Sequence, residues 1–338
     1  QRYFFTKNLL NDEKFGFLDI QSSYKARKYE TNKYSSFLNN NLNWVSNDFY
    51  NRYGIKSNIL ANIKNINYET ENIDTFKSSR TSEVFGALGN LIELNLEKKD
   101  GDSRHFLTPK ILFRYAPDSM RKEDKALKLN PVRAFNLDRL KNPNNFETGL
   151  STTVGLDYKI KKKNESLDFS IAQIINEEEN KKFSSESSLD EKVSDLFGSA
   201  KYNIKENLDL NYKFAVDQNY SEFNYNQLGA KLYLNPFNIQ FDYLHEDKHV
   251  GDQEYFNTKI NYNNNSNTIL SFETKRNIVT DSAEFYNLSY EYLNDCLKAG
   301  LVYRREFYED SEVEPEDSLM FKITLSTFAS LEQTASNK

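Results

Sequence analysis

The sequence predicts an all-β fold, an antiparallel transmembrane β-barrel meander of about 17 strands. Two patterns predict this fold: long runs in which apolar and polar residues alternate, and connections that are alternately short and long. A third observation argues against disorder. The mean hydropathy is −0.77, yet 14% of the 338 residues are aromatic, and disordered chains are poor in aromatic residues.

The alternation recurs along the chain. The clearest stretches, in order, are IKSNILANIK (55–64), LSTTVGLDYKI (150–160), NLDLNYKFAVDQ (207–218), LGAKLYL (228–234), FNIQFDY (237–243), FNTKINY (256–262) and LMFKITL (319–325). In 207–218, Leu208, Leu210 and Phe214 share one face, and Asp209 and Lys213 share the other. At about 9–13 residues each, such strands can cross a membrane. We therefore expect one face to meet lipid and the other a water-filled lumen.

The connections support the same interpretation. From residue 163 onward, short connections lie near 163–165, 205–207, 235–236, 263–267 and 294–297. Longer ones lie near 176–193, 218–222, 246–253, 277–284 and 308–317. Outer-membrane barrels have short periplasmic turns and long external loops, so residues 118–145 are expected to form the longest external loop.

A soluble all-β sandwich, in which apolar faces pack on each other, is the competing interpretation. Strand length and loop asymmetry disfavour it.

Composition narrows the function classes. The formal net charge is −6, and no basic patch interleaved with aromatic residues suggests a nucleic-acid partner. No run of about 18 apolar residues predicts a transmembrane helix. The single cysteine, Cys296, has no partner for a disulfide within this chain.

Twelve charged residues are predicted to face the lumen, where they would line a hydrophilic conduit or contact a lumen partner. They are Lys56, Lys64, Asp157, Lys159, Asp209, Lys213, Asp242, Lys259, Glu273, Lys275, Glu291 and Lys322. The alternative for each residue is ordinary solvation of a wide lumen. On the penultimate strand, one of Arg304 and Arg305 must point toward lipid, near the outer rim or by snorkelling.

The strand count suggests a partial barrel. The first expected strand, near 3–10, and the last, near 318–329, run in the same direction, whereas complete bacterial barrels have an even number of strands. We therefore expect residues 1–330 to be the C-terminal part of a larger barrel, followed by a polar tail at 331–338.

Three stretches carry a family resemblance: LTPKILFRYAPDSM (107–120), NPVRAFNLDRLKNPNNFETGLSTTVGLDYKI (130–160) and DCLKAGLVYRREFYEDSEVEPEDSLMFKITLSTF (295–328). The sequence there resembles the C-terminal barrel of the LptD family of lipopolysaccharide (LPS) assembly proteins. Its marks are an Arg-Ala-Phe and Asp-Arg core in a long insertion, then an alternating strand opened by Glu147 and Gly149. Outside 107–160 and 295–328 the resemblance is architectural.

The resemblance implies a barrel of about 26 strands in the outer membrane of a Gram-negative bacterium, without enzyme activity or cofactor. It implies that LPS passes through the lumen and leaves by a lateral opening at the last strand, which carries Leu319, Phe321, Ile323 and Leu325. The implied partners are LPS, an LptE-like lipoprotein in the lumen, and periplasmic LPS-bridge proteins. The bridge proteins would bind an N-terminal jelly roll that this sequence lacks.

The resemblance also gives a role to Cys296. Family members carry cysteines here that cross-link to cysteines near the N-terminus, in an oxidising compartment. Because Asp295 precedes Cys296, at most one such bridge to the missing N-terminal part is expected. A free thiol at the barrel rim is the alternative.

Two other function classes compete with LPS assembly. The first is a passive diffusion porin of the outer membrane. The second is an enzyme, suggested by HEDKH at 245–249, which matches the H-E-x-x-H zinc-protease pattern. That chemistry requires both histidines on one helix face, and here the motif follows a strand directly, so a solvated loop is favoured. The acidic loop at 308–318 could bind divalent cations, but a solvated loop is favoured there too.

Overall fold

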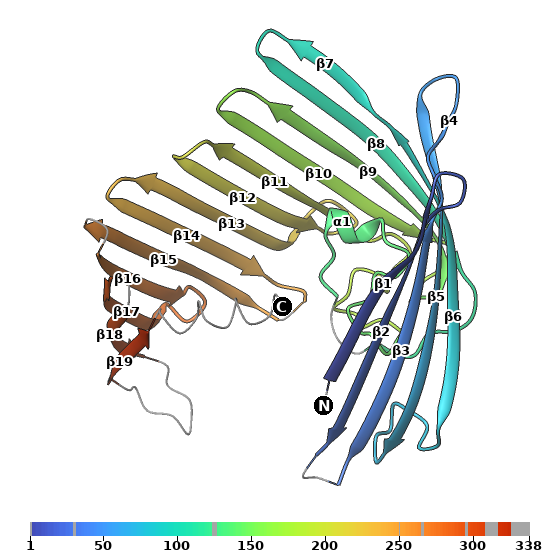
Figure 1. Ribbon diagram of the computed structural model, residues 1–338, viewed down its shortest axis with the longest axis horizontal. Coiled ribbons are helices and arrows are strands. Elements are labelled where there is room, and N and C mark those ends of the chain that lie inside the picture. Colours follow the sequence, from blue (N-terminus) through green and yellow to red (C-terminus); the bar gives the residue numbers. More distant parts are fainter. Residues whose placement is uncertain are drawn as a thin grey trace, which may run out of the picture. The chain divides into compact units, whose positions relative to one another are not determined.

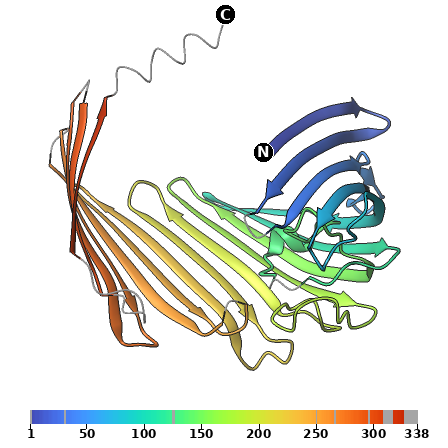
Figure 2. The ribbon, with the colours of Figure 1, turned by 90° about the horizontal axis from the view of Figure 1, so that it is seen from below.

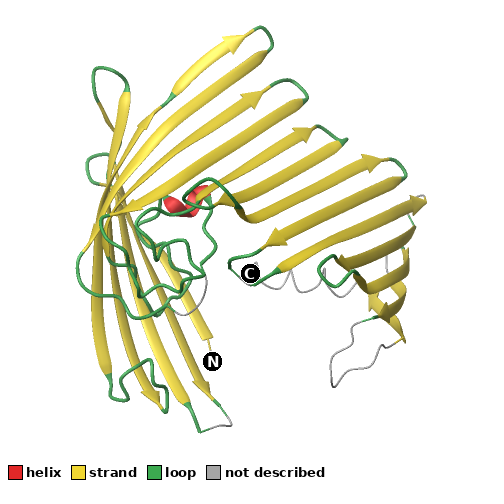
Figure 3. Cartoon of the chain, turned by 180° about the vertical axis from the view of Figure 1, so that it is seen from behind, coloured by secondary structure: helices red, strands yellow, loops and turns green. Residues whose placement is uncertain are grey.

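The computed structural model describes residues 2–29, 32–123, 127–249, 251–264, 267–294, 297–307 and 317–325. Within these ranges, nineteen strands form one sheet, an antiparallel meander with a single short helix (Figures 1 and 3). The strands are β1 (Arg2–Asp12), β2 (Gly16–Lys28), β3 (Tyr34–Val45), β4 (Phe49–Tyr50), β5 (Ile55–Glu71), β6 (Thr81–Leu94), β7 (Leu96–Asp100), β8 (Ser103–Ala116), β9 (Gly149–Lys161), β10 (Glu165–Asn176), β11 (Leu196–Ile204), β12 (Leu208–Val216), β13 (Phe223–Leu234), β14 (Phe237–Glu246), β15 (Gln253–Asn264), β16 (Thr268–Asn277), β17 (Ser282–Leu293), β18 (Leu297–Glu306) and β19 (Asp317–Leu325). The predicted all-β antiparallel fold is confirmed.

Two of these strands continue the strand before them. Both β3 and β4 pair with β5, and both β6 and β7 pair with β8. The nineteen elements therefore make seventeen passes in the part of the chain that the structure describes. This agrees with the predicted strand count.

The alternation of short and long connections extends to the N-terminal half. The turns 13–15, 51–54 and 101–102 are short, and the intervening connections 72–80 and 117–148 are longer. No helix in the described ranges is both long and apolar enough to cross a membrane.

The chain forms two compact units, which we describe separately. Unit 1 comprises Gln1–Lys162, Asp168–Ser199 and Ala215–Phe223, and unit 2 comprises Lys163–Leu167, Ala200–Phe214 and Asn224–Lys338.

In unit 1 the two faces of the strands differ in burial. Along β5, Ile59 and Ile63 are 40% and 50% exposed, whereas Asn58 and Lys64 are each 5% exposed. We call the face that carries Ile59 and Ile63 the open face, and the face that carries Asn58 and Lys64 the covered face. The alternation read from the sequence therefore gives two distinct faces, as expected for a period of two.

The covered face is covered by the described parts of the connection between β8 and β9, residues 117–123 and 127–148, which we call the covering loop (Figures 1 and 2). Leu137 and Phe146 of this loop join a buried cluster with Phe37, Ile66 and Phe85 of the strands. The sequence predicted an external loop at 118–145. As expected, the segment joins two strands at the end of the sheet that has the long connections. It nevertheless packs on the sheet, because its apolar side chains bury their surface against apolar side chains of the strands.

The covering loop contains the only helix of the described residues, α1 (Pro131–Ala134). The Asn130 side chain accepts a hydrogen bond from the Arg133 backbone N–H at 2.8 Å, and Pro131 occupies the first helical turn. These are the preferred residues for starting a helix.

In unit 2 the strand registers separate an apolar face from a polar face. One row across six strands contains Phe237, Tyr262, Leu270, Tyr290, Leu301 and Phe321. A row on the opposite face contains Gln240, Lys259, Glu273, Asn287, Arg304 and Ser318. Figure 2 shows these strands following one another in sequence order.

Candidate functional site

A buried ionic network joins the covering loop to the strands beneath it. Arg139 of the loop donates from Nε to Glu147 Oε2 at 2.7 Å, and its Nη2 donates to Ser151 Oγ of β9 at 3.0 Å. Arg114 of β8 donates from Nε to the Leu137 carbonyl at 2.6 Å. Arg139, Glu147 and Arg114 are 0%, 2% and 1% exposed. These contacts attach the second half of the loop to β8 and β9.

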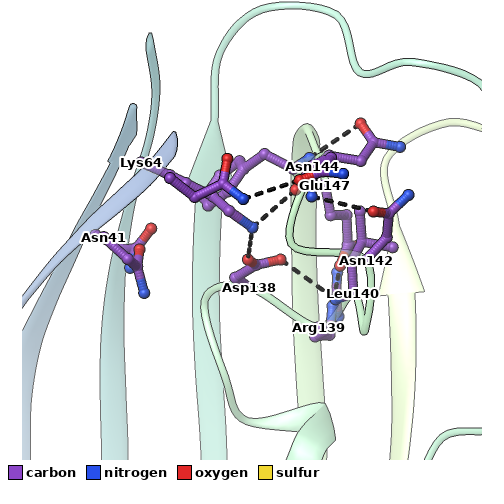
Figure 4. Close-up of polar contacts among 12 residues, drawn as sticks. Asn41, Lys64, Asp138, Arg139, Leu140, Asn142, Asn144 and Glu147 are labelled. Atoms are coloured by element: carbon purple, nitrogen blue, oxygen red, sulfur yellow. Dashed lines mark hydrogen bonds and ion pairs between the residues drawn. The ribbon is translucent and has the colours of Figure 1, made fainter. Parts of the chain in front are cut away.

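A second link runs from β5 to the same loop (Figure 4). Lys64 Nζ lies 2.8 Å from Asp138 Oδ2 and donates to the Asn145 carbonyl at 2.9 Å. Asn39 of β3 donates to Asn144 Oδ1 at 2.8 Å. Lys64, predicted to face the lumen, is thus a buried anchor for the covering loop.

Two buried carboxyl groups of the loop, Glu147 and Asp138, have pKa values shifted in opposite directions. Burial raises the pKa of Glu147, but the Arg139 and Arg114 guanidinium groups outweigh burial and hold that pKa below its ordinary value of 4.5. Burial also raises the pKa of Asp138, and the attraction of Lys64 does not fully offset it. Glu147 is therefore the carboxylate that the network stabilises most as an anion.

Two glycines let the loop approach the strands closely. A Cβ added to Gly155 would lie 2.7 Å from the Ile171 carbonyl and 2.8 Å from the Phe135 ring. A Cβ added to Gly89 would lie 2.7 Å from Leu137 Cδ2. Real Cβ atoms do not sit so close to other heavy atoms, so the fit of the loop requires glycine at 155, whereas at 89 the end of the Leu137 side chain would have to shift.

Three other predicted lumen residues of unit 1 form ion pairs on the same face. Lys56 lies 3.0 Å from Glu93 Oε2 and 3.6 Å from Asp48 Oδ1. Asp157 lies 2.5 Å from Lys110 Nζ. Lys159 lies 2.5 Å from Asp168 Oδ1. Strand pairing places these residues on the same face as the residues under the covering loop.

The predicted lumen residues of unit 2 also form ion pairs and hydrogen bonds. Lys259 is 3.6 Å from Glu273, Lys275 is 2.6 Å from Glu284, and Glu291 is 2.8 Å from Lys298. Asp242 accepts from Gln240 Nε2 at 2.6 Å, and Asp209 accepts from the Tyr233 hydroxyl at 3.2 Å. The registers put Asp242, Lys259, Glu273, Lys275, Glu291 and Lys322 on one face. Lys213 lies in β12. Whether these residues face a lumen stays a prediction.

The HEDKH motif spans the end of β14 and the turn after it. His249 Nδ1 lies 3.3 Å from Glu246 Oε1, and His245 Nε2 lies 3.4 Å from Asp247 Oδ1. The two histidines therefore do not share a helix face. Across the described ranges, no three His, Cys, Asp or Glu side chains are grouped so as to hold a metal ion.

The last strands carry the remaining predicted residues. On β19, Leu319, Phe321 and Ile323 are 68%, 69% and 56% exposed, and Leu325 ends the strand. Arg305 shares the apolar face with Tyr303 by parity and lies 3.7 Å from Asp317 Oδ1. Cys296 and most of the acidic loop, residues 308–316, lie outside the described residues.

Sequence reasoning did not identify the Arg114–Glu147–Arg139 network. The Asp-Arg pair at 138–139 and Glu147 were noticed only as marks of a resemblance. Charged residues next to apolar Phe135, Leu137 and Phe146 in a long connection were the available signal, because solvated loops rarely concentrate such apolar residues.

Comparison with known families supplies the context for this geometry. The family described as LPS transport system D (LptD) matches residues 14–261. The match includes the stretch 107–160 that carried the resemblance, and it ends before the stretch 295–328. No curated protein matches the chain.

Solved structures show low similarity. A mutant of the Rh. blastica porin shares 9% identity, with a TM-score of 0.33, over 95% of this chain and 99% of that chain. The open form of the ferric-catecholate import receptor Fiu from E. coli K12 shares 10% identity, with a TM-score of 0.39, over 91% of this chain and 63% of that chain.

Proposed function

Because this chain belongs to the LptD family of LPS transport to the outer membrane, we propose that LPS passes along its polar strand faces and leaves through a lateral opening at β19. The family match over residues 14–261 is the observation that carries this proposal. The mixed charges and amides of the polar face in unit 2 support it, because sugar hydroxyls and phosphates bind such groups.

The proposal assigns eleven of the twelve predicted charged residues, all except Lys64, to the conduit or to a lumen partner. An LptE-like lipoprotein would contact the exposed members, such as Lys259 and Glu291. Lys64 has a different role, since it is buried under the covering loop. Periplasmic LPS-bridge proteins would act through an N-terminal domain, and residues 1–330 would be part of the outer-membrane barrel.

The gate is proposed at the strand that carries Leu319, Phe321, Ile323 and Leu325. Support comes from the exposure of Leu319, Phe321 and Ile323, since the first two side chains are each more than two-thirds exposed. Cys296 is proposed to form a disulfide with the N-terminal part of the full-length protein. On non-reducing electrophoresis, Cys296→Ser should abolish a mobility shift that reducing agent also abolishes. An unchanged pattern would rule out the bridge.

The conduit is tested by photo-crosslinking in cells that make the full-length protein. A benzophenone amino acid replaces Asp242 on the polar face or, as the matched control, Phe241 on the apolar face of the same strand. We expect both positions to cross-link to LPS while transport runs. When upstream LPS supply is stopped, the cross-link at 242 should disappear, because it reports LPS in transit.

The cross-link at 241 should persist after supply stops, because resident outer-leaflet LPS still surrounds the protein. A cross-link at 242 that persists equally, or that never forms, would contradict passage along this face.

A further inference from the structure

The open face of unit 1 carries a hydrogen-bonded polar row that the covering loop does not reach. Ser22 Oγ donates to Asn40 Oδ1 at 2.8 Å, Asn40 Nδ2 donates to Asn65 Oδ1 at 3.4 Å, and Asn65 Nδ2 donates to Ser82 Oγ at 3.0 Å. These residues come from β2, β3, β5 and β6. We call them the open-face row.

The row begins where an apolar band ends. On the open face of β5, Ile55, Ile59, Ala61 and Ile63 precede Asn65, with Ser57, which is hydrogen-bonded to Asn90, between the first two. From Ile55 to Ile63 the strand extends about 27 Å, close to the apolar band of about 25 Å on outer-membrane barrels. The amides of the row can make more hydrogen bonds than those within the row, and hydrocarbon could not satisfy them, so the row fits the headgroup level of the bilayer.

The direction of the strands identifies which headgroups these are. Past Asn65, β5 leads into the longer connection 72–80, whereas its other end follows the short turn 51–54. Long connections of outer-membrane barrels face outward. The row therefore lies at the level of the outer leaflet.

A cleft adjoins the row on the outward side. It has a volume of about 330 Å³, and its lining includes Ser36, Asn67, Glu69, Arg80, Thr81 and Ser82. Arg80 Nε lies 3.0 Å from Glu69 Oε2, so the two formal charges of this lining cancel. The remaining lining residues are Leu38, Tyr68 and side chains with hydroxyl or amide groups, which both donate and accept hydrogen bonds.

We infer that the open-face row and this cleft form a binding site for the sugar headgroup of an outer-leaflet glycolipid. Sugar hydroxyls match the alternating donors and acceptors of amides and hydroxyls, and a neutral lining favours them over a bare phosphate. The inference rests on outer-membrane localisation. It does not depend on passage of LPS along the opposite face of the strands.

The site is tested with the full-length protein in nanodiscs that contain phosphatidylglycerol and LPS bearing its core oligosaccharide. Native mass spectrometry measures how many LPS molecules each protein retains. The test variant is Asn65→Leu with Asn67→Leu, which removes the centre of the row and one wall of the cleft. We expect LPS retention to fall about fivefold, while retention of phosphatidylglycerol does not change.

The matched control is Ser57→Leu with Asn90→Leu. Ser57 Oγ of β5 donates to Asn90 Oδ1 of β6 at 2.9 Å on the open face. This pair lies toward the end of the two strands opposite to the open-face row. This variant should retain LPS as the unchanged protein does. Equal retention in both variants, or an equal loss in both, would overturn the inference. Heat-modified migration on electrophoresis verifies that each variant is folded, and the cross-linking assay above reports transport separately.

Discussion

The polar face of unit 2 and the covered face of unit 1 follow the same alternation but have different surroundings. In unit 1, Arg139 and Glu147 meet at a buried contact. In unit 2, the side chains of Lys298 and Glu291 pair while 42% and 30% exposed. The comparison shows that the alternation determines which face is polar. The length and the residues of a connection determine whether that face remains exposed to solvent.

The difference should be largest in the energetics of the ion pairs. Replacing Arg139 with Ala leaves the Glu147 carboxylate buried without its closest cation. Breaking a buried pair in this way typically costs about 3–5 kcal/mol. Urea unfolding of the full-length protein, followed by circular dichroism, measures the loss.

The control for that variant is Arg104→Ala. Arg104 Nε donates to Glu97 Oε1 at 2.9 Å, and the two side chains are 57% and 48% exposed. An exposed pair contributes about 0–1 kcal/mol, so little change is expected. Similar losses for the two variants would mean that burial does not distinguish the two pairs.

Packing gives the next largest effect. Gly155→Ala places a Cβ against the Ile171 carbonyl and the Phe135 ring, which forces the covering loop outward. Overpacking of this kind costs about 1–3 kcal/mol. In unit 2, Gly300→Ala meets its nearest neighbour, Glu291 Cγ, at an ordinary 3.6 Å, so it should leave stability unchanged. If Gly155→Ala is equally silent, the loop does not need close contact.

A smaller difference between the two units is expected in how acid changes their stability. The folded-state pKa of Glu147 is lowered, so its contribution is complete above its ordinary value of 4.5 and is lost as pH falls through the lowered pKa. The contribution of Asp138 to the pH dependence of stability has the opposite sign, since its pKa is raised. An Asp138→Asn background therefore isolates Glu147.

In that background, urea unfolding should show constant stability from neutral pH to about pH 5 and a decline below it. Adding Glu147→Gln should remove the part of this decline that belongs to the network. A decline of the same size with Glu147→Gln would assign acid sensitivity to other groups.

The smallest effect is expected at an exposed pair of unit 2. A double-mutant cycle on Glu291→Ala and Lys298→Ala should give a coupling free energy of about 0.2–1 kcal/mol that shrinks in high salt. Coupling of several kcal/mol, insensitive to salt, would show that this face is covered in the full-length protein.

The strands were predictable, and the covering loop was not. Ile63 and Lys64 fall on opposite faces because a strand repeats every two residues, and any reader of the sequence can see that period. The irregular segment 117–148 has no period to read. Arg114, Arg139 and Glu147 are brought together by tertiary packing, and nothing in their spacing specifies the contact. The lumen role of residues such as Lys213 stays a prediction for a related reason, since strand parity identifies a face but not what lies against it.

The bond between Asn39 and Asn144 joins positions 105 residues apart, and it implies an order of assembly. Strands β3 and β5 follow each other along the chain and can pair early, because local contacts form faster than distant ones. Their shared apolar surface around Phe37 and Ile66 stays uncovered until the covering loop packs on it. We therefore expect an early intermediate with native strand pairing and an exposed apolar patch. A holdase chaperone that binds such patches would therefore act on this stage, and hydrogen exchange should show β3 protected before residue 139.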